Sequence, residues 1–170
     1  NEVVLLAGND NKGDATTTFA DQSKFHHTLT AAGDAQYDTA QAPTSMTSSA
    51  LFDGAGDSLS SASHADWQFG SGDFTVEFWV RFNNTASQRL LIGNITEGGG
   101  QSNSWGVLEN AGTLQAFLNS AGTWDLVNGG NFGSVTNGTW YHVALVRNGT
   151  SFVGYLDGVG TSLLTSSASL

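Results

Sequence analysis

The chain has 170 residues, 5 basic and 15 acidic side chains, a net charge of −10 and no cysteine. The negative charge argues against nucleic acid as a partner, because phosphate binding needs clustered Lys and Arg. The lack of cysteine excludes a disulfide scaffold and a thiolate metal site.

No apolar run reaches the roughly 18 residues that a membrane-spanning helix needs, so we expect no membrane insertion. The length suits one domain with a sizeable core, and we predict a single domain over 1–170. The chain begins with Asn1 and not with Met, so we expect it to be a fragment of a longer chain.

Short strands are predicted along the whole chain, because glycine recurs too often for long helices and no stretch keeps a helical period. One helical turn is expected at 63–70. Asn-Gly and Asp-Gly pairs between the strands supply the positive φ angles of hairpin turns, and we place such turns at 53–54, 110–112, 128–129, 137–138, 148–149 and 157–158. The predicted strands are 3–6, 16–19, 27–31, 48–52, 57–60, 73–82, 89–94, 104–109, 113–119, 123–128, 139–148, 151–157 and 161–165. This pattern predicts an all-β sandwich or barrel.

The stretch FTVEFWVRF, 74–82, alternates strictly between apolar and other residues. Its even positions predict a buried strand face. Its odd positions place Glu77, Trp79 and Arg81 on the opposite face, roughly 6.6 Å apart along the strand. An indole flanked by charged groups suits a sugar, because the ring stacks on C–H groups and the charges meet hydroxyls. Alternatively, Trp79 packs under a loop while Glu77 and Arg81 pair across strands, and we predict Trp79 to be mostly buried.

Two segments carry a family resemblance. The segment ALFDGAGDSLSSASHADWQFGSGDFTVEFWVRF and the later TWYHVALVRNGTSFVGYLDG resemble a laminin-G-like, concanavalin A-like jelly-roll domain. The opening VVLLAGNDNKGDATTTFADQS is similar to the first strand and the Asp-x-Ser loop of such domains. The resemblance implies an antiparallel jelly-roll β-sandwich. The usual closing strand, an Ile-Asp-acidic-Val-Arg segment, is missing, so the C-terminal strand of the fold is expected to be absent and an edge to be open.

Calcium is the cofactor that the resemblance implies, since some relatives hold this ion with Asp side chains and loop carbonyls. The candidate ligands are Asp21 in FADQS and the pair Asp53 and Asp57 in FDGAGD. Hard oxygen ligands on a tight glycine turn suit calcium. Alternatively, each Asp only stabilises a turn. The stretch NDNKGD at 9–14 looks like half of an EF-hand loop but lacks its final Glu.

Catalytic residues are not evident in the sequence. The polysaccharide hydrolases of this fold need two carboxyl groups about 5–5.5 Å apart when they retain configuration, and no predicted strand carries two acids at i and i+2. The four histidines show no zinc-binding spacing, and His142 is interpreted as structural.

These observations favour a non-enzymatic adhesion or carbohydrate-binding module whose partners are glycans or a cell-surface polysaccharide. The Ser-, Thr-, Ala- and Gly-rich composition most resembles modules in virion proteins of aquatic bacteriophages, which implies a virion surface or extracellular location. The alternative is a structural decoration or assembly domain that binds other virion proteins through its open edge. A polysaccharide-cleaving enzyme ranks last.

Overall fold

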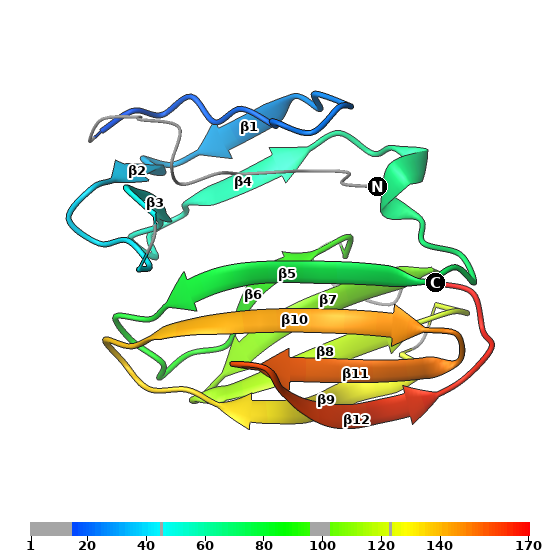
Figure 1. Cartoon of the computed structure of the whole chain (residues 1–170). Coiled ribbons are helices and arrows are strands. Elements are labelled where there is room, and N and C mark those ends of the chain that lie inside the picture. Colours follow the sequence, from blue (N-terminus) through cyan, green and yellow to red (C-terminus); the bar gives the residue numbers. More distant parts are fainter. Residues whose placement is uncertain (1–14, 45, 96–102, 123) are drawn as a thin grey trace. The chain divides into compact units, whose positions relative to one another are not determined.

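The computed structural model describes residues 15–44, 46–95, 103–122 and 124–170 (Figure 1). The chain divides into two compact units, Asn1–Asp66 and Trp67–Leu170. The strand predicted at 3–6 and the EF-hand-like stretch at 9–14 lie outside the described residues. The prediction of one domain over 1–170 stays a prediction.

The first unit holds two small antiparallel ladders, in which β1 pairs with β4 and β2 pairs with β3. A small core lies between them, where the rings of Phe19 and Tyr37 stack with centroids 4.7 Å apart. The strands are β1 (Leu29–Ala32), β2 (Gln36–Asp38), β3 (Ser49–Leu51) and β4 (Ser58–Ser61), and a short 3-10 helix, η1 (Ala65–Trp67), follows them.

The second unit consists of two four-stranded antiparallel sheets, with strand orders β12-β11-β10-β5 and β6-β7-β8-β9. Figure 1 shows both sheets, with β5 in green and β10 to β12 in orange to red. The strands are β5 (Phe74–Arg81), β6 (Arg89–Gly93), β7 (Ser104–Asn110), β8 (Thr113–Asn119), β9 (Val127–Ser134), β10 (Trp140–Asn148), β11 (Ser151–Leu156) and β12 (Val159–Thr165).

The core of the second unit lies between these two sheets. Leu114 and Leu118 of β8 belong to the same buried cluster as Leu145 of β10 and Phe152 of β11. The even face of β5 packs against this cluster, as predicted. The described chain is therefore an all-β sandwich, which confirms the predicted fold class. No helix among the described residues is long and apolar enough to span a membrane.

Two of the predicted hairpin turns have the backbone geometry that their sequences require. Ala111 and Gly112 join β7 to β8 with φ values of 49° and 81°. Asp157 and Gly158 join β11 to β12 with φ values of 49° and 79°. Positive φ at both central residues is typical of the type I′ turn, whose twist matches that of the flanking strands. These short turns set the registers of β7 with β8 and of β11 with β12.

Other predictions of local structure were wrong. No strand forms at 16–19, although the backbone there contributes a hydrogen bond from Tyr37 N to Thr16 O. The expected turn at 128–129 lies inside β9, where Gly129 has a φ of 73°. Asn128 pairs with Phe117 and Gly130 with Ala116, so Gly129 is the additional residue of a β-bulge.

Arg147 of β10 is a buried cation, 2% exposed, on the core side of its sheet. Its guanidinium donates hydrogen bonds to the carbonyl oxygens of Gly70, Gly149 and Ala168. Leu170, 1% exposed, then exchanges two backbone hydrogen bonds with Gly70. Arg147 therefore holds the segment after β12 against the loop before β5.

Replacing Arg147 with Met is expected to lower the free energy of unfolding by about 1–3 kcal/mol, because three partly buried hydrogen bonds to carbonyl groups lose their donor. The Met side chain keeps much of the aliphatic packing and removes the donors. Amide hydrogen exchange is the sharper measurement, because the Leu170 N–H should exchange faster in the variant. Unchanged protection of that amide would contradict the role assigned to Arg147.

Candidate functional site

The odd positions of β5 lie on the outer face of the β5-β10-β11-β12 sheet, away from the core. The antiparallel register places Trp79 opposite His142 and Glu77 opposite Ala144. Because side chains of paired residues lie on the same face of a sheet, His142 joins the predicted row. We call Glu77, Trp79 and His142 the outer-face trio.

Trp79 is 43% exposed. The prediction that it is mostly buried was therefore wrong. That prediction assumed that loops fold over this face, whereas the exposed fraction shows that much of the indole is open to solvent in this structure. The ring of His142 lies beside it, with centroids 5.3 Å apart and planes inclined by 53°. An exposed indole on the outer face of a strand can stack on a ligand.

Glu77 and His142 provide polar atoms next to that indole. His142 Nε2 lies 3.3 Å from Glu77 Oε2, and the side chains are 32% and 61% exposed, respectively. The backbone of His142 is held in place by Asp157, whose Oδ1 accepts the His142 N–H at 2.8 Å. The trio thus combines an apolar ring with a carboxylate and an imidazole that can accept and donate hydrogen bonds.

Arg81 points toward a different part of the unit. Its Nε donates to Gly138 O at 3.2 Å and its Nη1 donates to Asn83 Oδ1 at 2.7 Å. These bonds direct the guanidinium to the turn before β10. The sequence therefore identified Glu77 and Trp79, and it missed His142, because only the pairing of β5 with β10 brings His142 to this face.

The outer face of the other sheet also carries polar and aromatic side chains. Gln115 of β8 donates to Asn131 Oδ1 of β9 at 2.9 Å. The ring of Phe117 meets Trp124 edge to face, with centroids 5.4 Å apart. Trp124 is only partly exposed and has a φ of 49°. Trp124 on this second face therefore serves as a control for Trp79 of the outer-face trio.

The candidate calcium ligand Asp21 is engaged by its own loop. Its carboxylate accepts hydrogen bonds from the backbone N–H groups of Ser23 and His27, both at 2.8 Å, and from the Ser23 hydroxyl at 2.9 Å. The side chain is buried, with 6% of Asp21 exposed. These contacts fit the alternative interpretation, in which Asp21 stabilises a turn.

Asp53 and Asp57 are brought together with a third carboxylate, Asp34, which the sequence analysis missed. One oxygen from each of the three lies within 4.8 Å of the others. Asp57 accepts the backbone N–H groups of Asp34 and Asp53 at 2.8 and 2.7 Å. A hydrogen bond with Asp57 and the negative charges of Asp53 and Asp57 raise the pKa of Asp34 above its ordinary value. Three hard oxygen donors fit calcium chemically, and the same bonds also stabilise the turn.

The glutamates needed for hydrolysis are not gathered at one place among the described residues. Glu77 is on the outer face described above. Glu109 is fully buried. It accepts the Gly112 N–H at 2.7 Å, and its Oε2 lies 3.5 Å from Arg89 Nε. The buried Glu109 therefore stabilises the β7–β8 turn through this hydrogen bond.

Comparison with known proteins agrees with this architecture. A laminin-G family model, described as the concanavalin A-like lectin/glucanases superfamily, matches residues 53–168. The chain belongs to this family. The predicted laminin-G-like, concanavalin A-like resemblance is thereby confirmed, and the superfamily's name covers both lectins and glucanases.

Comparison with solved structures finds a protein of similar fold. The crystal structure of an S-layer domain-containing protein from Clostridium thermocellum matches with a TM-score of 0.50 and 17% sequence identity, covering 99% of this chain and 73% of that chain. This likeness concerns the fold alone. No curated protein matches the chain.

Proposed function

We propose that the chain is a non-enzymatic, surface-exposed adhesion module that binds carbohydrate through the outer-face trio. The observation that carries the proposal is the 43% exposure of Trp79 on a sheet face beside Glu77 and His142. The indole would stack on the C–H face of a sugar while the carboxylate and the imidazole meet its hydroxyl groups. Membership of a superfamily that includes lectins supports this function.

A glycan array probed with the intact chain tests the proposal, and we expect binding to one or a few surface polysaccharides. Absence of binding to every polysaccharide, with and without calcium, would contradict it. Release of reducing ends from a bound polysaccharide would instead revive the hydrolase alternative. Glu77 is the one described glutamate on the outer face, whereas retaining hydrolysis needs a carboxyl pair about 5–5.5 Å apart.

A location outside the cell fits this proposal. An S-layer domain-containing protein has a similar fold, which supports a surface or extracellular setting without naming one. The finer placement on a virion stays a prediction from composition.

Assembly with other proteins is the second candidate function, and the edge of one sheet favours it. Among the described residues, β12 is an edge strand, as β5, β6 and β9 are, and it is singled out by Val159 at its start, which is 71% exposed. An open edge accepts a further strand from a partner. Cross-linking of the chain in its parent assembly should then join β12 to another protein. Cross-links found only elsewhere would contradict edge pairing.

Calcium binding at Asp53 and Asp57, with Asp34 as the third carboxylate, stays a prediction with a direct test. The hydrogen bond with Asp57 and the repulsion from Asp53 and Asp57 raise the pKa of Asp34, and a bound cation would offset this repulsion. Calcium at a hundred times its dissociation constant should stabilise the chain by about 2.7 kcal/mol, so the melting temperature should be higher in calcium than in EDTA. Asp57→Asn should remove this difference, and Asp21→Asn should keep it. Equal melting temperatures in calcium and EDTA would exclude the site.

A further inference from the structure

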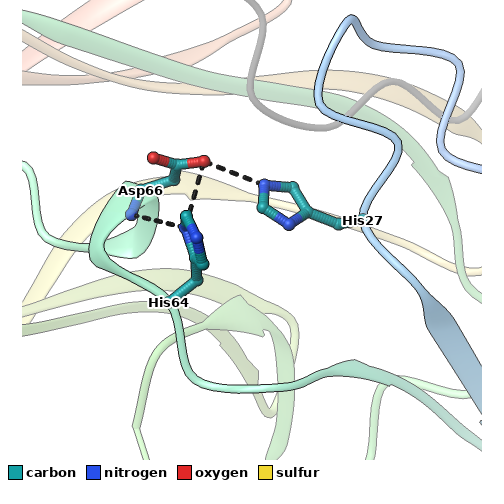
Figure 2. A group of neighbouring side chains, drawn as sticks. All are labelled: His27, His64 and Asp66. Carbon is teal, nitrogen blue, oxygen red and sulfur yellow. Dashed lines mark hydrogen bonds and ion pairs between the residues drawn. The ribbon is translucent and has the colours of Figure 1, made fainter.

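Three side chains of the first unit converge on one point (Figure 2). His27 Nε2 lies 3.0 Å from Asp66 Oδ2, and His64 Nδ1 lies 3.1 Å from the same oxygen. The two imidazole rings meet edge to face, with centroids 4.9 Å apart. All three donor atoms lie within 4.8 Å of one another. We call these residues the His-Asp cluster.

The pairing of β1 with β4 brings the cluster together from distant parts of the sequence. Leu29 pairs with Ser61 at the end of this ladder. His27 precedes Leu29 by two residues, and His64 follows Ser61 by three, so both flank the same end. Asp66 then lies in η1. Zinc-binding sequence motifs place their ligands close together in the sequence. The His-Asp cluster has no such motif, because strand pairing brings its residues together.

The loop around Asp21 fixes one side of the cluster. Asp21 Oδ2 accepts the backbone N–H of His27 at 2.8 Å, and the same carboxylate binds Ser23 through two hydrogen bonds. This arrangement places His27 where its ring reaches Asp66. The buried Asp21 therefore has a positioning role for the His-Asp cluster, whether or not calcium binds elsewhere.

The donor set matches the ligands of a divalent transition ion. We propose that His27, His64 and Asp66 bind zinc, with water completing the coordination. Zinc takes imidazole nitrogen and carboxylate oxygen at about 2.0–2.2 Å, which puts tetrahedral ligand atoms about 3.4 Å apart. The two nitrogen–oxygen distances of 3.0 and 3.1 Å are a few tenths of an ångström shorter than this, and the two imidazole nitrogens, which lie within 4.8 Å of each other, must reach the same separation.

Access and charge also suit a metal ion. The side chains are 13% exposed for His27, 22% for Asp66 and 53% for His64, so an ion can enter from solvent. Neutral imidazoles and one carboxylate leave a net positive charge on the bound zinc, which a water ligand can accommodate. Calcium prefers six or more oxygen ligands, so this nitrogen-rich set discriminates against it.

The competing interpretation is a hydrogen-bonded brace without metal. The Asp66 N–H donates to His64 Nδ1 at 3.2 Å, and zinc binding at that nitrogen would replace this long hydrogen bond. If the cluster is only a hydrogen-bonded brace, zinc should change neither the melting temperature nor the NMR signals of the histidine side chains. If the cluster is a zinc site, zinc binding should be saturable and should weaken when any of the three side chains is replaced.

Calorimetric titration of the chelator-treated full chain with zinc chloride distinguishes a zinc site from a metal-free brace. We expect one zinc ion per chain. Because loss of an outer-shell partner alone costs about 10–100-fold in affinity, loss of a ligand in His64→Ala or Asp66→Asn should weaken binding by about 100-fold or more. His64 is the primary variant, because its exposed side chain makes misfolding a small risk. Cobalt(II) absorption in the visible region reports the ligand set independently.

The matched control is His26→Asn. His26 has a φ of 49°, a conformation that Asn tolerates, and its Nδ1 lies 3.1 Å from Asp21 O, outside the cluster. This variant should keep zinc affinity and the cobalt spectrum. No saturable binding at millimolar zinc would overturn the proposal, and so would binding that survives His64→Ala and Asp66→Asn but disappears in Asp57→Asn.

Discussion

Replacing Phe78 with alanine is expected to lower the free energy of unfolding by about 3 kcal/mol, the lower end of the range for Phe→Ala in protein cores. The Phe78 side chain packs against the core of the second unit, opposite the fully buried Val143 of β10. Phe78 itself is only partly buried, which is why the lower end applies. Chemical denaturation followed by tryptophan fluorescence measures the change.

Thr75→Ala is the control on the same strand, because Thr75 is exposed on the opposite face of β5. A surface substitution of this kind should change the free energy of unfolding by no more than about 0.5 kcal/mol. Equal effects of the two substitutions would mean that the faces of β5 are assigned the wrong way round.

Trp79→Ala is expected to abolish most carbohydrate binding while the chain stays folded. Truncation of an aromatic anchor at a binding surface commonly costs more than about 1 kcal/mol, and a loss of about 1.4 kcal/mol corresponds to tenfold weaker binding. The 43% exposure of Trp79 limits the loss of packing. Isothermal titration with a polysaccharide selected on the array measures affinity, and thermal melting measures the folded fraction.

Trp124→Ala is the matched control, because Trp124 is a partly exposed indole that packs against Phe117 on the other sheet. It should leave the affinity unchanged. If Trp124→Ala loses binding and Trp79→Ala keeps it, the binding face is the sheet formed by β6 to β9. If Trp79→Ala unfolds while Trp124→Ala stays folded, the Trp79 indole is needed for packing, which would contradict its assignment as an exposed binding group.

The alternation of 74–82 and the Asp-Gly turn at 157–158 predicted β5 and the β11–β12 hairpin because both are local signals. The strand predicted at 123–128 was wrong in its bounds, since it overlaps β9 (Val127–Ser134) only at its last two residues. A period of two fixes which face of β5 meets the core, and positive φ at Asp157 and Gly158 fixes the hairpin. The Asn-Gly pair at 128–129 misled because the same preference for positive φ serves a β-bulge as well as a turn.

The candidate sites were predicted only in part because they depend on pairing between distant segments. Glu77 and Trp79 lie two apart on one strand, so their shared face was visible in the sequence. His142 reaches them through the β5–β10 register, and Asp34 reaches Asp57 from the turn between β1 and β2. The exposure of Trp79 depends on what covers the sheet, which no local pattern encodes.

The pairing of Gly70 with Leu170 brings the two ends of the segment 70–170 side by side. Two backbone hydrogen bonds, at 2.8 and 2.9 Å, join these residues, and such antiparallel pairs have Cα atoms about 5.5 Å apart. A linker of a few residues would close 70–170 into a ring that can be reopened at the β10–β11 turn without crossing the core.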